Sequence, residues 1–148
     1  MIIKNGRVFQ EDGTFAEKDL YIEGKRFVST KEEVIDQEVI DAKGMMVLPG
    51  LVDHGAAGHD FSDGDVEGLK EILRYEKAHG ITSYCPTSMT LPKDDLLKIF
   101  GTIEAIKDEP EAEVIAGVNM EGPFIDPIKK GAQAEENIVA PNAAFFRA

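Results

Sequence analysis

The sequence has 148 residues, of which 16 are Lys or Arg and 28 are Asp or Glu, so its formal net charge is −12. Apolar residues make up 43% of the chain and charged residues 30%, a balance typical of a folded globular protein. The length suggests about one domain and excludes a complete (β/α)₈ barrel, which needs roughly 250 residues. The acidic charge argues against nucleic acid or an anionic membrane as the main partner, because phosphates are recognised by Lys and Arg.

Three features favour a cytoplasmic protein without a membrane span. No apolar run approaches the ~18 residues that a transmembrane helix needs. Residues 1–13 lack the long apolar core of a signal peptide. The single cysteine, Cys85, excludes an internal disulfide framework and suits a reducing compartment.

The first 48 residues predict a small antiparallel β unit, since no helical periodicity of useful length occurs there. Residues 1–9 are short and alternate apolar with polar side chains. Gly24 lies at an expected hairpin turn between two strand-like runs in residues 19–30. Residues 38–50 predict a further strand pair around Gly44.

After Pro49 the pattern changes to alternating strands and helices. In chain order we expect a strand from residue 51, a helix over 65–79, a strand over 81–90, a helix over 92–107, a strand over 113–120 and the start of a helix at 141–148. Asp63 or Asp65 can cap the first helix, and Gly80 can end it. This alternation predicts three parallel strands with right-handed helical crossovers.

Two of the expected strand ends carry residues suited to chemistry, because functional groups of parallel sheets gather at the carboxyl ends of strands. The first is residues 53–60, which contain His54 and His59. At the second, Glu121 follows a buried apolar strand and precedes Gly-Pro, where a carboxylate could bind a metal or a sugar. Glu121 could instead cap a loop or the next helix, and His54 could be a loop residue without a ligand role.

Other reactive side chains have simpler interpretations. His79 lies beside the expected helix stop, where a cation favours the helix C-terminus. Cys85 lies within a strand and is better explained as a small buried side chain than as a nucleophile. Lys129 and Lys130 suit a solvated loop, although they could meet a phosphate. The sequence contains no Ser-His-Asp set, no Walker loop and no Cys cluster.

Five motifs follow one another along the chain: LPGLVD at 48–53, HGAAGHDF at 54–61, GITSYCPT at 80–87 with Thr90, MEGPFI at 120–125 and KKGAQ at 129–133. Together they resemble the N-terminal portion of the N-acetylglucosamine-6-phosphate deacetylases, a family of the amidohydrolase superfamily. LPGLVD alone is shared by many amidohydrolases, whereas EGPFI followed by KKGAQ is specific. The resemblance covers essentially all 148 residues.

The resemblance implies an α/β fold, namely an incomplete (β/α)₈ TIM-type barrel preceded by part of a small β-sandwich domain. The sandwich part would be residues 1–48, and the first three βα units of the barrel would be residues 49–148. The implied reaction is hydrolysis of N-acetylglucosamine 6-phosphate to glucosamine 6-phosphate and acetate in amino-sugar catabolism. A divalent metal, zinc or iron, would polarise the amide and activate water. Whole family members are expected to be homo-oligomers.

The same resemblance suggests site residues. Glu121 matches the family's metal-binding glutamate, and His54 is a second, weaker candidate ligand. Ala132 matches a substrate-contacting position, Gln133 stands beside it, and His59 matches the loop after the first barrel strand. The substrate would be an amino-sugar phosphate.

Two departures from the family pattern lower the expected activity. Many members carry a His-x-His pair after the first barrel strand, whereas here Asp53 runs directly into His54, so the pair cannot form. The family's catalytic aspartate and later metal histidines are expected beyond Ala148, which leaves no catalytic residue in this chain. We therefore expect weak metal binding, no turnover by the chain alone, and self-association through an open sheet edge.

Two alternatives remain open from the sequence. One is another amidohydrolase, dihydroorotase-like or deaminase-like, although EGPFI with KKGAQ argues against it. The other is a non-catalytic remnant or a small α/β binding module. Screening the gene product on N-acetylglucosamine 6-phosphate separates the first alternative, and histidine-bearing strands downstream would exclude the second.

Overall fold

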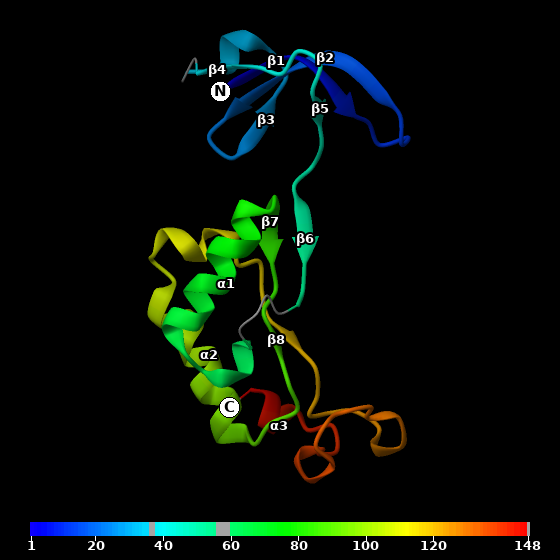
Figure 1. The fold of residues 1–148 in the computed structure, drawn as a ribbon, viewed down its shortest axis with the longest axis vertical. Coiled ribbons are helices and arrows are strands. Elements are labelled where there is room, and N and C mark those ends of the chain that lie inside the picture. Colours follow the sequence, from blue (N-terminus) through cyan, green and yellow to red (C-terminus); the bar gives the residue numbers. More distant parts are fainter. Residues whose placement is uncertain (36–37, 56–59, 148) are drawn as a thin grey trace. The chain divides into compact units, whose positions relative to one another are not determined.

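The structure is a computed structural model, and it describes residues 1–35, 38–55 and 60–147. The chain divides into two compact units, Met1–Pro49 and Gly50–Ala148. The first unit is a β-sheet, and the second contains the three α-helices together with parallel strands (Figure 1). No helix in the described part of the chain is long and apolar enough to cross a membrane.

The first unit is a five-stranded sheet in which β2 and β1 are central. Its strands are β1 (Ile2–Phe9), β2 (Phe15–Glu23), β3 (Arg26–Val28), β4 (Val39–Asp41) and β5 (Met46–Val47). The order is β3-β2-β1-β4, and β5 also pairs with β1. β1 with β2 and β2 with β3 are antiparallel, and Gly24 has φ +57° between β2 and β3. The hairpin predicted at Gly24 is therefore confirmed.

The prediction of an antiparallel strand pair around Gly44 is wrong. β4 and β5 each pair with β1, and both pairings are parallel. The Ala42 amide donates to Lys4 O at 2.8 Å, and the Arg7 amide donates to Met45 O at 3.0 Å. The segments before and after the turn at Gly44 therefore both bond to β1. The chain continues in the same direction along β1 after this turn and does not form a hairpin.

The second unit alternates strands with helices. Its elements are β6 (Leu51–Asp53), α1 (Val66–Ala78), β7 (Ile81–Tyr84), β8 (Thr87–Ser88), α2 (Lys93–Ile106), β9 (Asn119–Met120) and α3 (Ala143–Phe146), with short 3₁₀ helices at Phe61–Asp63, Pro110–Val114, Pro127–Lys129 and Glu135–Asn137. β6 pairs with β7 and β8 pairs with β9, both in parallel. The predicted alternation and the parallel pairing are confirmed. The strand predicted over 81–90 divides at Pro86, which has no amide to donate.

The third strand is shorter than the prediction over 113–120. Residues Pro110–Val114 form a 3₁₀ helix, and an isolated parallel bridge joins Tyr84 to Ile115 before β9 begins. Ion pairs attach this 3₁₀ helix and its N-cap residue Glu109 to α1: Lys70–Glu109 at 2.7 Å, Arg74–Glu111 at 3.2 Å and Lys77–Glu113 at 3.9 Å. The proline start and these side-chain contacts account for the turn where the sequence pattern predicts extended chain.

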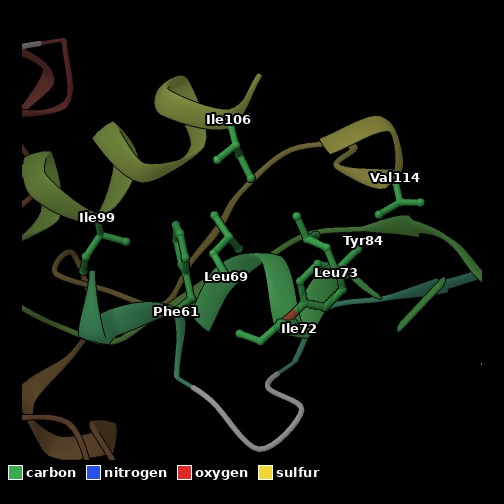
Figure 2. Close-up of a cluster of buried hydrophobic side chains, with 8 residues drawn as sticks. All are labelled: Phe61, Leu69, Ile72, Leu73, Tyr84, Ile99, Ile106 and Val114. Atoms are coloured by element: carbon green, nitrogen blue, oxygen red, sulfur yellow. The ribbon is translucent and has the colours of Figure 1, made fainter. Parts of the chain in front are cut away.

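The side chains of residues 83–90 alternate between two environments, as strand geometry requires. The even-numbered ones are buried and the odd-numbered ones are half-buried. Tyr84 belongs to the core that α1 and α2 cover (Figure 2), whose buried members are Phe61, Leu69, Ile72, Leu73, Tyr84, Ile99, Ile106 and Val114. The even-numbered side therefore faces the helices. We call the opposite side, which carries Ser83, Cys85 and Thr87, the open face.

Candidate functional site

The open face continues from β8 onto β9. The Asn119 side-chain amide donates to Thr87 Oγ1 at 3.1 Å, so these two side chains share it. A Cβ at Gly117 would lie 4.0 Å from Cys85 Sγ, which puts that glycine on the same side. Because strand side chains alternate, Glu121 falls on the open face, two residues after Asn119.

Glu121 lies at the carboxyl end of the third parallel segment. Its amide donates to Ser88 O at 3.2 Å, and its carbonyl accepts a hydrogen bond from Thr90 Oγ1 at 3.0 Å. The side chain is exposed, and within the part of the chain that the structure describes its carboxylate has neither a hydrogen bond nor an ion pair. The backbone of Glu121 is thus fixed at the strand end while its carboxylate is available to a ligand.

The loop formed by residues 121–139 is fastened to Thr90, just beyond β8. The Thr90 amide donates to Gln133 Oε1 at 2.8 Å, and Asn137 Nδ2 donates to Thr90 O at 3.1 Å. Together with the bond from Thr90 Oγ1 to Glu121 O, these contacts join three points of the loop to one residue. The loop therefore has a defined position at the strand ends, although it contains little regular structure.

Gln133 and Ala132 differ in their surroundings. Gln133 is only 4% exposed, and its Nε2 also donates to Met89 Sδ at 3.8 Å. Ala132 is exposed in the same loop. The Gln133 side chain is therefore occupied by contacts that hold the loop, whereas Ala132 lies where a ligand could reach it. The substrate role of both residues stays a prediction.

The histidines predicted at the first strand end are only partly described. His54 directly follows β6 and is exposed, and its amide donates to Asp53 Oδ1 at 2.8 Å. The prediction for His59 lies outside the described residues. His79 is exposed after α1, and its Nδ1 lies 2.7 Å from Tyr75 O, in line with a role at the helix end.

Behind the first strand end lies a group of titratable side chains on the helix side of the sheet. Burial, together with the negative charges of Glu76, Asp53 and Asp60, raises the pKa of Tyr84 to about 12. Burial also raises the pKa of Glu76, with Asp53 adding to the rise and His79 opposing it. Tyr84 therefore stays protonated at neutral pH, and its hydroxyl donates to Gly55 O, which holds the start of the loop after β6.

The remaining candidate side chains have limited roles in this arrangement. Lys130 Nζ donates to Gln133 O at 3.1 Å, so this lysine helps to fix its own loop, while Lys129 is exposed at the end of a 3₁₀ helix. Cys85 is a free cysteine and is half-buried on the open face, rather than fully buried as the sequence suggested.

The described residues do not make up a metal site by themselves. No group of three or more His, Cys, Asp or Glu side chains that could hold a metal occurs among the described residues. Glu121 and His54 offer one oxygen donor and one nitrogen donor, both exposed at or just after strand ends. Zinc and iron accept both kinds of donor, but a catalytic zinc usually has three protein ligands.

The sequence did not indicate the residues that hold the site together. Thr90 and Asn137 bind partners 31 to 47 residues away, and no local periodicity marks them. The Thr87–Asn119 hydrogen bond also joins two different strands. Of these residues, only Thr90 belongs to the deacetylase-like motifs, and the resemblance predicted no role for it.

The second unit therefore defines a mixed α/β protein with parallel strands and an exposed carboxylate at a strand end that has no bonded partner in the described part of the chain. No family model matches the chain. The mouse N-acetylglucosamine-6-phosphate deacetylase is 32% identical over 145 residues, which cover 90% of this chain and 36% of the mouse protein. The chain thus spans about a third of the length of this curated relative.

Solved structures agree with this similarity. The crystal structure of the Thermotoga maritima N-acetylglucosamine-6-phosphate deacetylase matches with a TM-score of 0.73 and 25% identity, covering 99% of this chain and 39% of that one. A Mycobacterium smegmatis deacetylase, solved in complex with N-acetyl-D-glucosamine-6-phosphate, has the same TM-score at 20% identity, covering 99% and 39%. The resemblance to the N-terminal portion of the N-acetylglucosamine-6-phosphate deacetylases is therefore confirmed.

Proposed function

We propose that this chain supplies the N-terminal part of a metal-dependent deacetylase that hydrolyses N-acetylglucosamine 6-phosphate to glucosamine 6-phosphate and acetate. Residues 49–148 would form the first three βα units of a (β/α)₈ barrel, and residues 1–48 part of a β-sandwich domain. The proposal rests on the exposed carboxylate of Glu121 just after β9, which has no bonded partner among residues 1–35, 38–55 and 60–147. The names of the relatives favour a deacetylase over a dihydroorotase-like or deaminase-like enzyme.

In this proposal Glu121 and His54 would hold a divalent metal, zinc or iron. When bound, such a metal polarises the amide carbonyl and lowers the pKa of water. The chain's own residues would prepare the site. Thr90 and Ser88 fix the backbone of Glu121, and Ala132 would meet the sugar from the loop that Gln133 fastens.

The chain alone should bind metal weakly and should not turn over substrate. Glu121 and His54 provide fewer ligands than the three protein side chains of a usual catalytic zinc site. The general acid and base would also have to come from a residue that the resemblance places beyond residue 148. For the whole enzyme we propose an amino-sugar phosphate substrate, a homo-oligomer and a cytoplasmic location.

A zinc titration by calorimetry and an acetate-release assay with N-acetylglucosamine 6-phosphate test this proposal on the 148-residue chain. We expect weak zinc binding that Glu121→Gln lowers at least about tenfold, because the substitution removes an anionic ligand and keeps the shape. Glu136→Gln is the control, since Glu136 is exposed in the same loop. We expect no acetate release from any of these proteins.

Two results would contradict the proposal. Zinc binding that is equal in the Glu121→Gln and Glu136→Gln proteins would remove Glu121 from the metal site and leave a non-catalytic module as the better interpretation. Sustained acetate release by the 148-residue chain would show that its own residues complete the catalytic site.

A further inference from the structure

Thr90 makes polar contacts to three separate points of the loop at the strand ends. Its Oγ1 donates to Glu121 O at 3.0 Å, its amide donates to Gln133 Oε1 at 2.8 Å, and its carbonyl accepts from Asn137 Nδ2 at 3.1 Å. Thr90 is 2% exposed and Gln133 is 4% exposed. The Thr90–Gln133 hydrogen bond is therefore buried, where a missing partner is costly, and the bonds to Glu121 and Asn137 are partly buried.

The backbone next to Glu121 is shaped to receive the Thr90 hydroxyl. Gly122 has φ +83°, a conformation that L side chains rarely adopt. A Cβ at this position would lie 2.0 Å from Thr90 Oγ1, so the hydroxyl occupies the space that a side chain would need. Gly122 thus permits both the turn after Glu121 and the close approach of Thr90.

The neighbouring residue extends this arrangement to the first strand end. The Met89 amide donates to Ser62 Oγ at 3.0 Å, and Ser62 lies in the 3₁₀ helix Phe61–Asp63. Segments that follow β6, β8 and β9 therefore meet at residues 89 and 90. A displacement of Thr90 would therefore move the backbone of Glu121 and the loop that bears Ala132 together.

We propose that Thr90 is a positioning residue: it fixes Glu121 and the loop that bears Ala132 relative to each other. The inference deepens the proposed function and rests on it, because Glu121 is taken as a metal ligand. Thr90 itself does not touch the metal in this proposal. It acts through the Glu121 backbone and through the side chains of Gln133 and Asn137.

The test compares Thr90→Val, Thr90→Ser and a matched control in the 148-residue chain. Valine keeps the shape of threonine and removes the hydroxyl, whereas serine keeps the hydroxyl. Thr102→Val is the control, since Thr102 is also buried and its hydroxyl donates to Ile99 O at 2.6 Å within α2. The readouts are amide hydrogen exchange over 120–125 and 129–137, and zinc affinity by calorimetry.

In Thr90→Val we expect exchange over 120–125 to rise at least about tenfold, with a smaller rise over 129–137. Zinc affinity should fall roughly tenfold, the scale typical of lost support behind a metal ligand. Thr90→Ser should restore both values, and Thr102→Val should leave them unchanged. Because Gln133 accepts from the Thr90 backbone, Gln133→Met should loosen 129–137 more than 120–125.

Unchanged exchange over 120–125 in Thr90→Val would overturn the inference. A second result would also overturn it: Thr90→Val speeds exchange but leaves zinc affinity unchanged, although Glu121→Gln lowers that affinity. Thr90 would then have a structural role only. If Glu121→Gln leaves zinc affinity unchanged, the proposed function fails. The hydrogen-exchange rates of Thr90→Val and Thr90→Ser then decide by themselves whether Thr90 fixes the backbone of Glu121.

Discussion

Glu76 is a largely buried carboxylate that the proposed chemistry does not use. It lies on α1 and is 6% exposed, and its side chain has no hydrogen bond or ion pair within the described residues. Burial is the main cause of its raised pKa, and the nearby Asp53 charge adds to it. Folding therefore disfavours the ionised form of this side chain relative to the unfolded chain.

Replacing Glu76 with Gln should stabilise the chain at neutral pH. The folded pKa lies above the ordinary value of 4.5, so the ionised wild-type residue destabilises the fold once the pH exceeds the folded pKa. Below about pH 4.5 Glu76 is protonated in both states, and the advantage of Gln should vanish. Thermal unfolding at pH 4 and pH 8 measures this difference.

The matched control for this prediction is Glu71→Gln, because Glu71 is exposed on the same helix. It should change the melting temperature little at either pH, since exposed charges contribute little to stability. A Glu76→Gln protein that is less stable than wild type at pH 8 would show that the ionised carboxylate has a favourable partner in solution.

For single residues, the sequence predicted which residue types lie at strand ends, but not the hydrogen bonds that join them to other segments. Glu121 was identified because a carboxylate directly follows an apolar strand. Gln133 was identified only by resemblance, and its contact with Thr90 spans 43 residues of sequence. Side-chain hydrogen bonds of this kind depend on tertiary packing, which no local pattern encodes.

The first helix shows how an element selects one of two possible caps. The sequence allowed either Asp63 or Asp65 to begin α1. In the structure Asp65 Oδ2 accepts from the Gly68 amide at 3.0 Å, and Asp65 Oδ1 accepts from the Glu67 amide at 3.3 Å. Asp63 instead ends the preceding 3₁₀ helix. Asp65 therefore satisfies amides that would otherwise lack partners.

Asp65→Ala should lower the free energy of unfolding by about 1 kcal/mol, the usual loss for an N-cap. Asp63→Ala removes the same charge two residues earlier and should have a much smaller effect. Urea unfolding followed by the helical circular dichroism signal measures both. Equal effects would mean that charge near the helix N-terminus, rather than the cap itself, stabilises α1.

Helices were easier to predict than strands because their apolar spacing is long and local. The helix predicted over 65–79 differs from α1 by one residue at each end. The strand predicted over 113–120 fails over its first part because the 3₁₀ helix Pro110–Val114 extends into it, with Glu113 paired to Lys77 of α1 at 3.9 Å. The pairing of β4 and β5 with β1 depends on partners far along the chain, so the sequence around Gly44 suggested a hairpin instead.

For the molecule as a whole, the alternation of strands and helices was predictable, but what covers the sheet edges was not. Within the described residues β6 pairs only with β7, and β9 only with β8. Large apolar side chains are exposed in the same region, including Leu51 at 57% and Val52 at 71%. A parallel strand normally has neighbours and covered faces, so an open apolar edge favours association with another chain.

We therefore expect the 148-residue chain to self-associate with rising concentration, and Val52→Lys to reduce this association. A lysine on an edge strand opposes strand pairing because its charge would have to lose water. Ala105→Lys is the matched control: it adds the same charge at an exposed position of α2, away from the open edge. Sedimentation velocity over a concentration series measures both. A wild-type chain that stays monomeric throughout, or an equal effect of the two lysines, would contradict association through the β6 edge.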